Sequence, residues 1–219
     1  MILNTDFFDR DACTVAHDLL GKVIRHKFKG HWLAAQIIET EAYYLEEKGS
    51  HASLGFTEKR KALFMPAGTI YMYYARGHDS LNISARGEGN AVLVKSAHYF
   101  HDDFCDNNNL KIMQSLNPLP SGNTRRTDKL CSGQTLLCKA LGLKVKDWDQ
   151  QQLTKKQLFI DDVNYKPKKI IQTTRLGIPL GRDEHLYYRY IDYDFVRSST
   201  KNPLTRRNWI EGTDYKIIK

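Results

Sequence analysis

The chain has 219 residues and a formal net charge of +8, from 33 Lys and Arg against 25 Asp and Glu. Hydrophobic residues make up 41% and aromatic residues 11%, which excludes a disordered chain, and no apolar run approaches the ~20 residues of a membrane span. The positive charge favours a polyanionic partner, nucleic acid before an anionic membrane, although a basic enzyme without such a partner can have the same composition. Without a linker or a repeat, we expect a single domain over residues 1–219, with a core at about 12–200 and a basic C-terminal tail at 201–219.

The N-terminal residues and the cysteines indicate the compartment and the metal content. Residues 1–10 contain two Asp and no long apolar core, so they are not expected to form a signal peptide. None of the cysteines has Cys-x-x-Cys spacing; they are Cys13, Cys105, Cys131 and Cys138. We therefore expect reduced thiols in a cytoplasmic protein, associated with the nucleoid if the source is bacterial, with no metal site and no cofactor.

Hydrophobic periodicity predicts a mixed α+β chain. Apolar residues at helical spacing over 12–20, followed by Gly21, predict the first helix. Residues 44–68 are expected to be loop, and 197–219 either a frayed end or a phosphate-contacting strip. The predicted strands are 23–29, 32–41, 69–74, 80–85, 91–97, 158–160, 169–172, 176–178 and 187–191, and two further helices are expected at 110–116 and 136–141.

Two carboxylates stand in one of these strands. Because side chains alternate along a strand, Glu39, Glu41 and Tyr43 share one face. Burying a carboxylate in so apolar a run is costly unless the group is paired or functional. Spacing alone leaves two interpretations open, a functional pair or two charges at a solvated strand end.

The strands 69–74, 80–85 and 91–97 have short connections and predict an antiparallel meander. Tyr73 lies beside a hairpin tip with Arg76, a shape that can enter a DNA groove. The loop His51 and the basic run 59–61 could serve a site or simply be solvated, since both patterns are common on surfaces.

Several motifs occur together in one order over roughly residues 12–200. The chain resembles the alkyladenine (3-methyladenine) DNA glycosylase family, the monofunctional base-excision enzymes of bacteria and animals. The matching segments are Asp18-Leu-Leu-Gly-Lys-Val23, Ile37-Ile-Glu-Thr-Glu-Ala-Tyr43, Ser50-His-Ala52, Gly68-Thr-Ile-Tyr-Met-Tyr73, Leu81-Asn-Ile-Ser84, Ala91-Val-Leu-Val94, Leu130-Cys-Ser-Gly133, Lys139-Ala-Leu-Gly142 and Arg175-Leu-Gly-Ile178.

The resemblance implies one α+β domain built on a curved antiparallel sheet, an open barrel-like core with flanking helices and a protruding β-hairpin. It implies an enzyme that flips a damaged purine nucleotide out of DNA and hydrolyses its N-glycosidic bond without cutting the strand. In that family, the residue at the position of Glu41 activates the attacking water. Those at Tyr43, His51 and Tyr73 stack on the flipped base, and the one at Asn82 helps reject an unwanted exocyclic amino group.

The chain departs from the family at three places. The family has a Tyr wedge at the hairpin tip where this chain has Arg76, so either Arg76 or Tyr74 fills the gap in the base stack. The family has an Arg that helps hold the water, and here it is Lys95, which keeps the charge but loses the planar fork. Around residues 133–135 the family's Pro and Lys are absent. Lys59 and Arg60 are the expected phosphate contacts.

The expected partner is double-stranded DNA that contains damaged purines, of the 3-methyladenine, 7-methylguanine, hypoxanthine and ethenoadenine class. No membrane partner is expected, and nothing in the sequence requires more than a monomer. Two other functions remain open at this point. One is a non-catalytic nucleic-acid-binding module on the same fold, and the other is an RNA-binding or RNA-modifying protein.

Overall fold

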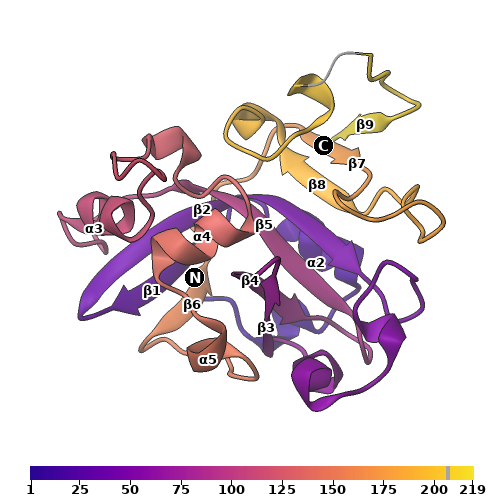
Figure 1. The fold of residues 1–219 in the computed structure, drawn as a ribbon, viewed down its shortest axis with the longest axis horizontal. Helices are drawn as coiled ribbons and strands as arrows, with labels where there is room; N and C mark the ends of the chain where they lie inside the picture. Colours follow the sequence, from indigo (N-terminus) through magenta and orange to yellow (C-terminus); the bar gives the residue numbers. More distant parts are fainter. Residues whose placement is uncertain (206–207) are drawn as a thin grey trace.

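The computed structural model describes residues 1–205 and 208–219, and within them nine strands form one antiparallel sheet that is not closed into a barrel (Figure 1). Its order is β3-β4-β5-β2-β8-β7-β9, and β1 pairs with β2 and with β6. The strands are β1 Val23–Phe28, β2 His31–Tyr43, β3 Ile70–Ala75, β4 His78–Ser84, β5 Ala91–Tyr99, β6 Leu158–Asp161, β7 Ile170–Thr173, β8 Arg189–Asp192 and β9 Tyr215–Ile218. This confirms the predicted α+β class and the meander of β3, β4 and β5.

Short helices flank the sheet, and capping residues mark where they begin and end. The Asp11 side chain accepts the amide hydrogen of Thr14 and so caps α2. Helix α4 ends at Gly142, whose φ of 68° is left-handed and whose missing Cβ would lie 2.6 Å from the Phe28 ring. The helices are α1 Thr5–Phe8, α2 Ala12–Asp18, α3 Asn109–Leu116, α4 Gln134–Leu141 and α5 Val145–Trp148, with 3-10 turns η1 Ala52–Leu54, η2 Glu58–Phe64, η3 Thr127–Lys129, η4 Tyr193–Phe195 and η5 Pro203–Thr205.

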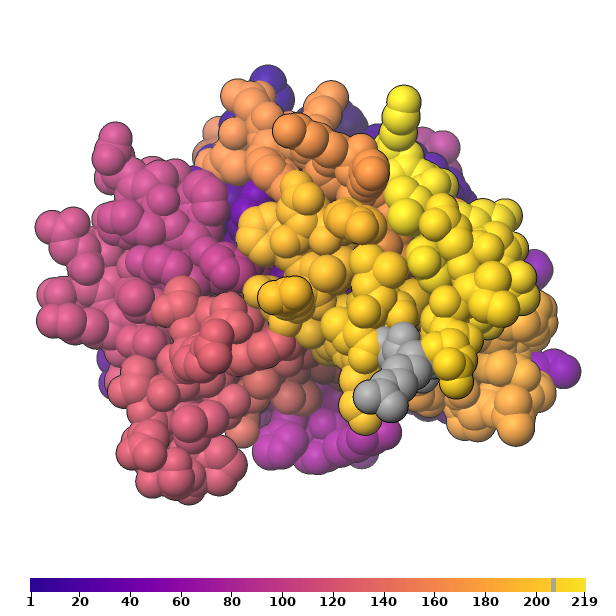
Figure 2. Space-filling view, turned by 90° about the horizontal axis from the view of Figure 1, so that it is seen from above, coloured from indigo at the N-terminus to yellow at the C-terminus, as the bar shows by residue number. Residues whose placement is uncertain are grey.

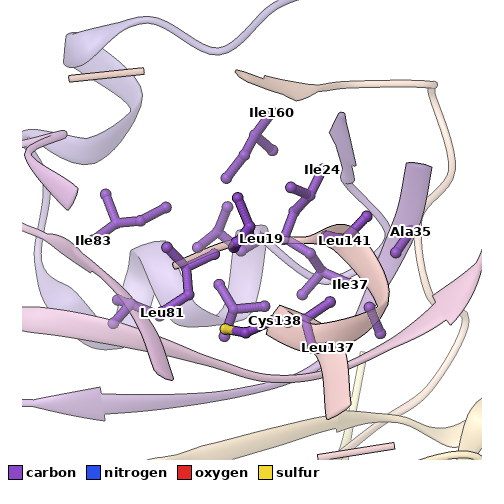
Figure 3. Packing of buried hydrophobic residues seen from close by; sticks show 14 of the residues in the cluster. Leu19, Ile24, Ala35, Ile37, Leu81, Ile83, Leu137, Cys138, Leu141 and Ile160 are labelled. Atoms are coloured by element: carbon purple, nitrogen blue, oxygen red, sulfur yellow. The ribbon is translucent and has the colours of Figure 1, made fainter. Parts of the chain in front are cut away.

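The main core lies between the sheet and the helices α2 and α4. Leu19, at the end of α2, and Leu137, from α4, point into the same apolar cluster as Ile37 of β2 (Figure 3). All three side chains are fully buried. This packing holds one face of β2, and the other face is left to the polar residues described below.

A change of register decides which way the carboxylates of β2 point. The pairing of β2 with β5 shifts on both sides of Glu39. Before the shift, Ala35 and Ile37 pack in the main core, and after it Ala42 does. The core-facing side chains thus change from odd to even positions, so that Glu39 and Glu41 point away from the core. Without this irregularity, both carboxylates would lie among the apolar core residues.

The same irregularity places two β5 side chains beside the carboxylates. Lys95 is the residue left over between Val94 and Ser96, the latter of which pairs with Glu39. Lys95 extends to Glu41, while the Ser96 hydroxyl donates to a Glu39 oxygen at 2.6 Å. Such a bulge re-aims side chains, here toward one polar cluster.

Some sequence-based expectations were wrong. Residues 176–178 form a turn, because Gly177 has a φ of 82°, which a strand does not allow. Residues 44–68 are not plain loop, since they contain η1 and η2. Of the two interpretations left open for the C-terminal tail, the frayed end is excluded, because β9 pairs with β7 and the last segment lies against the rest of the molecule (yellow in Figure 2). Arg206 and Arg207, expected on a phosphate-contacting strip, lie outside the described residues.

None of the helices in the described part of the chain has the length and apolar character to cross a bilayer. Within the same residues, no group of three or more His, Cys, Asp or Glu is arranged to hold a metal ion. The four cysteines are free thiols, and burial raises the pKa of Cys131 to about 12. Such a thiol is a packing group, not a nucleophile.

Candidate functional site

A single row of paired residues crosses five strands and forms the base of the site. Tyr71 pairs with Asn82, Asn82 with Leu93, and Leu93 with Glu41. Glu41 in turn pairs with Arg189 of β8. Directly paired residues point to the same side of a sheet. Tyr71 and Arg189, which are far apart in the chain, therefore belong to one polar and aromatic surface.

A pocket of about 780 Å³ opens above this row. It brings together most of the residues that the sequence singled out, and Glu41, Lys59 and Arg60 are the exceptions. The predicted site residues that line it are Tyr43, His51, Tyr73, Tyr74, Arg76, Asn82 and Lys95. An aromatic pocket with a few converging polar groups suits a flat ligand.

Glu41 lies directly behind the pocket wall. Its side chain is 0% exposed, which excludes a solvated strand end. The Tyr43 hydroxyl donates to Oε2 at 2.7 Å, the Leu176 amide donates to Oε1 at 3.1 Å, and Lys95 Nζ lies 3.3 Å from Oε1. Each of these three partners lines the pocket. Only these direct hydrogen-bond and ion-pair partners therefore separate the buried Glu41 carboxylate from a ligand in the pocket.

Tyr43 joins the carboxylate to the aromatic wall. Burial raises the pKa of Tyr43 well above its ordinary value, and so do the negative charge of Glu41 and the hydrogen bond that the Tyr43 hydroxyl donates to it. The phenol therefore keeps its proton and remains a hydrogen-bond donor. The Arg175 guanidinium lies 4.5 Å from the centre of the Tyr43 ring. Arg175 also donates to the Ala42 carbonyl and pairs with the buried Glu47. The ring is therefore fixed by its hydroxyl and by the cation against it.

His51 and two tyrosines form a second aromatic group at the pocket. The His51 and Tyr73 rings are 4.4 Å apart, and Tyr71 and Tyr73 stack at 5.5 Å. His51 Nδ1 lies 3.0 Å from the Tyr71 hydroxyl. Packing against these rings, together with the charges of Arg60 and Arg182, lowers the pKa of His51, so it is neutral at pH 7. A neutral imidazole does not repel a cationic ligand.

The pocket floor carries an amide with a fixed orientation. Asn82 is 5% exposed, and its Nδ2 donates to the Tyr71 carbonyl at 3.2 Å. The Asn82 amide therefore cannot rotate freely to suit every ligand. A group held in this way can distinguish ligands by their hydrogen-bond pattern.

Glu39 belongs to a closed polar network next to the pocket. Arg189 Nε donates to its Oε1 at 2.7 Å, and the Thr200 amide donates to its Oε2 at 2.9 Å. Burial alone would raise the pKa of Glu39, but the Arg189 charge and the hydrogen bonds from Ser96 and Thr200 hold it below its ordinary value. Glu39 is thus ionised, but its partners Ser96, Thr200 and Arg189 do not line the pocket, so Glu41 is the reactive candidate.

The hairpin of β3 and β4 projects the predicted wedge residues. Its two-residue turn is Arg76-Gly77, with φ of 50° and 79°, the left-handed pair of a type I′ turn. Tyr74 is 60% exposed at the pocket rim. Lys59 is exposed on η2, whereas Arg60 donates to the carbonyls of Leu54 and Gly55 and so fixes the loop of the pocket.

Sequence reasoning did not assign roles to several residues of the site. Leu176 supplies an amide to Glu41, and Arg189 pairs with both carboxylates, at 4.0 Å from Glu41 Oε1. The sequence feature that could have identified Arg189 is its charge within the aromatic run 187–190. A charged residue in an otherwise buried type of strand is also what drew attention to Glu41. The other unassigned pocket residues include Ser50, Leu54, Tyr71, Leu93, Gln134, Thr135 and Arg182.

The sequence of the chain is similar to those of known proteins over almost its whole length. Residues 6–195 match the methylpurine-DNA glycosylase family. A Pseudomonas aeruginosa protein is 62% identical over 212 residues, which are 97% of this chain and 88% of that protein. A Pseudomonas syringae pv. tomato protein is 62% identical over 216 residues (99% and 96%), and one of Carboxydothermus hydrogenoformans is 31% identical over 194 residues (87% and 94%). These three relatives carry the provisional name 3-methyladenine DNA glycosylase. The chain therefore belongs to the methylpurine-DNA glycosylase family of DNA-repair enzymes.

Proposed function

We propose that this chain removes alkylated and deaminated purines from duplex DNA, with the damaged nucleotide flipped into the 780 Å³ pocket. The substrate class comprises 3-methyladenine, 7-methylguanine, hypoxanthine and ethenoadenine. The chain is proposed to act as a single-domain monomer, because the pocket is complete within one copy of the chain, and to work in the cytoplasm, where its four free cysteines stay reduced. The observation that carries the proposal is the buried Glu41 carboxylate directly behind an aromatic pocket.

The proposed reaction is hydrolysis at the anomeric carbon. A water oxygen attacks C1′, Glu41 accepts the water proton, and the bond from C1′ to the base nitrogen breaks, its electron pair leaving with the base. The transition state is oxocarbenium-like, so the same carboxylate also stabilises positive charge on the sugar. Lys95, 3.3 Å from Glu41, orients the carboxylate and the water. No amine attacks the sugar, so no strand cleavage is expected.

The aromatic walls are proposed to hold the flipped base. Tyr43 on one side and His51 with Tyr73 on the other stack on the purine, at about 1–3 kcal/mol for each stacked base. An alkylated purine is cationic, and the neutral His51 tolerates that charge. Asn82, fixed by the Tyr71 carbonyl, disfavours the exocyclic amino group of an undamaged guanine.

The surface around the pocket is proposed to contact the duplex. Arg76, at the apex of the hairpin turn, fills the gap left by the flipped nucleotide, because its planar guanidinium can stack between bases. Lys59 is free to reach a phosphate. Arg60 instead positions the loop that carries Leu54, since its guanidinium donates to that loop.

A lesion panel tests the proposal. Duplexes that each carry one lesion of the four named above are incubated with the protein, and free base and strand breaks are measured separately. We expect free base and an abasic site that breaks only under alkali. Tight, salt-dependent binding without release of any base would instead identify a non-catalytic binding module.

Tyr43→Phe should lower kcat/KM roughly 10- to 100-fold, because a hydrogen bond to a charged group is worth about 1.5–3 kcal/mol while the stacking ring is retained. Steady-state release of 7-methylguanine measures the effect. Tyr165→Phe is the matched control, since the Tyr165 hydroxyl also bonds a carboxylate, Asp192 at 2.9 Å, away from the pocket. Equal activities of the two variants would show that the Tyr43 hydroxyl does not support Glu41.

Arg76→Gly should weaken binding to lesion-containing duplex roughly 10- to 100-fold, because it removes a stacking side chain worth about 1–3 kcal/mol. Glycine retains the left-handed turn, so the hairpin keeps its shape. Tyr74→Ala is compared in the same fluorescence-anisotropy titration. A larger loss in Tyr74→Ala would assign the wedge to Tyr74.

A further inference from the structure

We propose that Arg189 and Glu39 form a buried positioning pair that keeps Glu41 charged and correctly aimed, although neither residue touches the DNA. This inference rests on the proposed function of Glu41 as the base. It assigns to a residue of β8, far from the recognisable motif in sequence, control over the pH range in which the site works.

The geometry begins with the sheet register. Arg189 stands opposite Glu41 in the pairing of β8 with β2, and it is 0% exposed. Its Nε lies 4.0 Å from Glu41 Oε1 and donates to Glu39 Oε1 at 2.7 Å. One guanidinium thus lies between two buried carboxylates. Such a cation lowers the repulsion that would otherwise favour protonation of one of them.

Arg189 is itself held in place. Its Nη2 donates to the Thr200 hydroxyl at 3.0 Å and to the Lys201 carbonyl at 2.8 Å. Among the described residues, its Nη1 has no hydrogen-bond partner. The guanidinium is therefore positioned by Glu39 and by the segment after η4, and it retains a spare donor.

Glu39 cannot replace Glu41 as the base. Both of its oxygens accept short hydrogen bonds, from Ser96 at 2.6 Å, from the Thr200 hydroxyl at 2.6 Å and from Arg189. None of these three partners lines the pocket, whereas the partners of Glu41 do, so a water held in the pocket can reach Glu41 but not Glu39. Glu39 serves to hold Arg189, and Arg189 in turn faces Glu41.

The charges around Glu41 balance only when this pair is complete. Two carboxylates, Glu39 and Glu41, face two cations, Arg189 and Lys95. Removal of Arg189 alone leaves one cation for two buried anions, and removal of the Glu39 charge alone leaves one anion for two cations. The titratable and charged groups that face Glu41 come from four strands: Glu39 and Tyr43 of β2, Tyr73 of β3, Lys95 of β5 and Arg189 of β8.

The test is the pH profile of kcat/KM for release of 7-methylguanine. This base carries a fixed positive charge and needs no protonation before it leaves, so the acidic limb of the profile reports the ionisation of the enzyme. Arg189→Gln should move the acidic limb to higher pH by about 1–3 pH units, because a neighbouring carboxylate disfavours ionisation. Glu39→Gln should move it to lower pH. The double variant Glu39→Gln/Arg189→Gln restores the charge balance, so its limb should return toward that of the wild type.

The controls separate this inference from stability and from the proposed function. Arg86→Gln, at an exposed arginine outside the pocket lining, should leave the limb unchanged. The inference would be overturned if the two single variants and the double variant lost activity or had a lower Tm while the acidic limb stayed at the wild-type pH. A purely structural role lowers stability but does not shift the limb. If Arg189→Gln does not fold, the Glu39→Gln profile still decides. A wild-type protein that releases no base would contradict the proposed function instead.

Discussion

Replacement of Glu41 by Gln is expected to lower kcat/KM for base release by about 10²–10⁴-fold, the usual contribution of a general base. Glutamine has nearly the same shape and can still accept the Leu176 amide hydrogen, so the fold and DNA binding should be retained. The reason for the loss is chemical, because an amide cannot take the proton of the attacking water. Single-turnover release of 7-methylguanine, with binding measured in parallel, gives the effect.

Glu46→Gln is the matched control, because Glu46 is an exposed glutamate a few residues further along the same segment. It removes the same charge from the chain but lies outside the pocket lining. Its activity should equal that of the wild type. A folded Glu41→Gln variant with full activity would contradict the role given to the carboxylate.

The second large effect is on stability. Leu137→Ala should lower the free energy of unfolding by about 2–5 kcal/mol, because Leu137 is fully buried between α4 and the sheet and its removal leaves a cavity (Figure 3). This is a large part of the total stability of a domain, which is about 5–15 kcal/mol. Urea denaturation followed by circular dichroism measures it.

Leu180→Ala provides the comparison, because Leu180 is 89% exposed and makes little core contact. Its substitution should change the free energy of unfolding by less than about 0.5 kcal/mol. Equal losses of unfolding free energy in the two leucine variants would contradict the packing described for Leu137 between α4 and the sheet.

Local patterns were enough to predict most of the sheet. Alternating side chains and short polar turns identified the meander of β3, β4 and β5, and helical spacing identified α2 and α4. The segment 176–178 was predicted as a strand because its apolar residues resemble one. The left-handed Gly177 ends any strand there, and the freed Leu176 amide serves Glu41 instead.

The environment of the carboxylates could be predicted only in part. Alternation placed Glu39 and Glu41 on one face, but the register shift that turns this face away from the core comes from the pairing with β5. Pairing between distant strands leaves no periodic signal in either strand alone. For the same reason Arg189, which lies 150 residues from Glu39, could not be recognised as its partner.

The buried Glu41 carboxylate is held in a fixed position by its neighbours. The carboxylate is kept in place by Lys95, Tyr43 and the Leu176 amide, so the site is organised before any DNA binds. Preorganised groups need little rearrangement in the transition state. Entry of a base would have to place its sugar next to these three partners, because Glu41 itself is 0% exposed and they line the pocket.

The central claim is that a damaged nucleotide enters this pocket with its sugar beside Glu41. The most direct measurement is a crystal structure of the Glu41→Gln variant bound to a duplex with a single ethenoadenine. We expect the base stacked between Tyr43 and His51, and a water between C1′ and the side-chain amide that replaces the Glu41 carboxylate. A base that remains stacked in the duplex, or that binds elsewhere on the protein, would contradict the account.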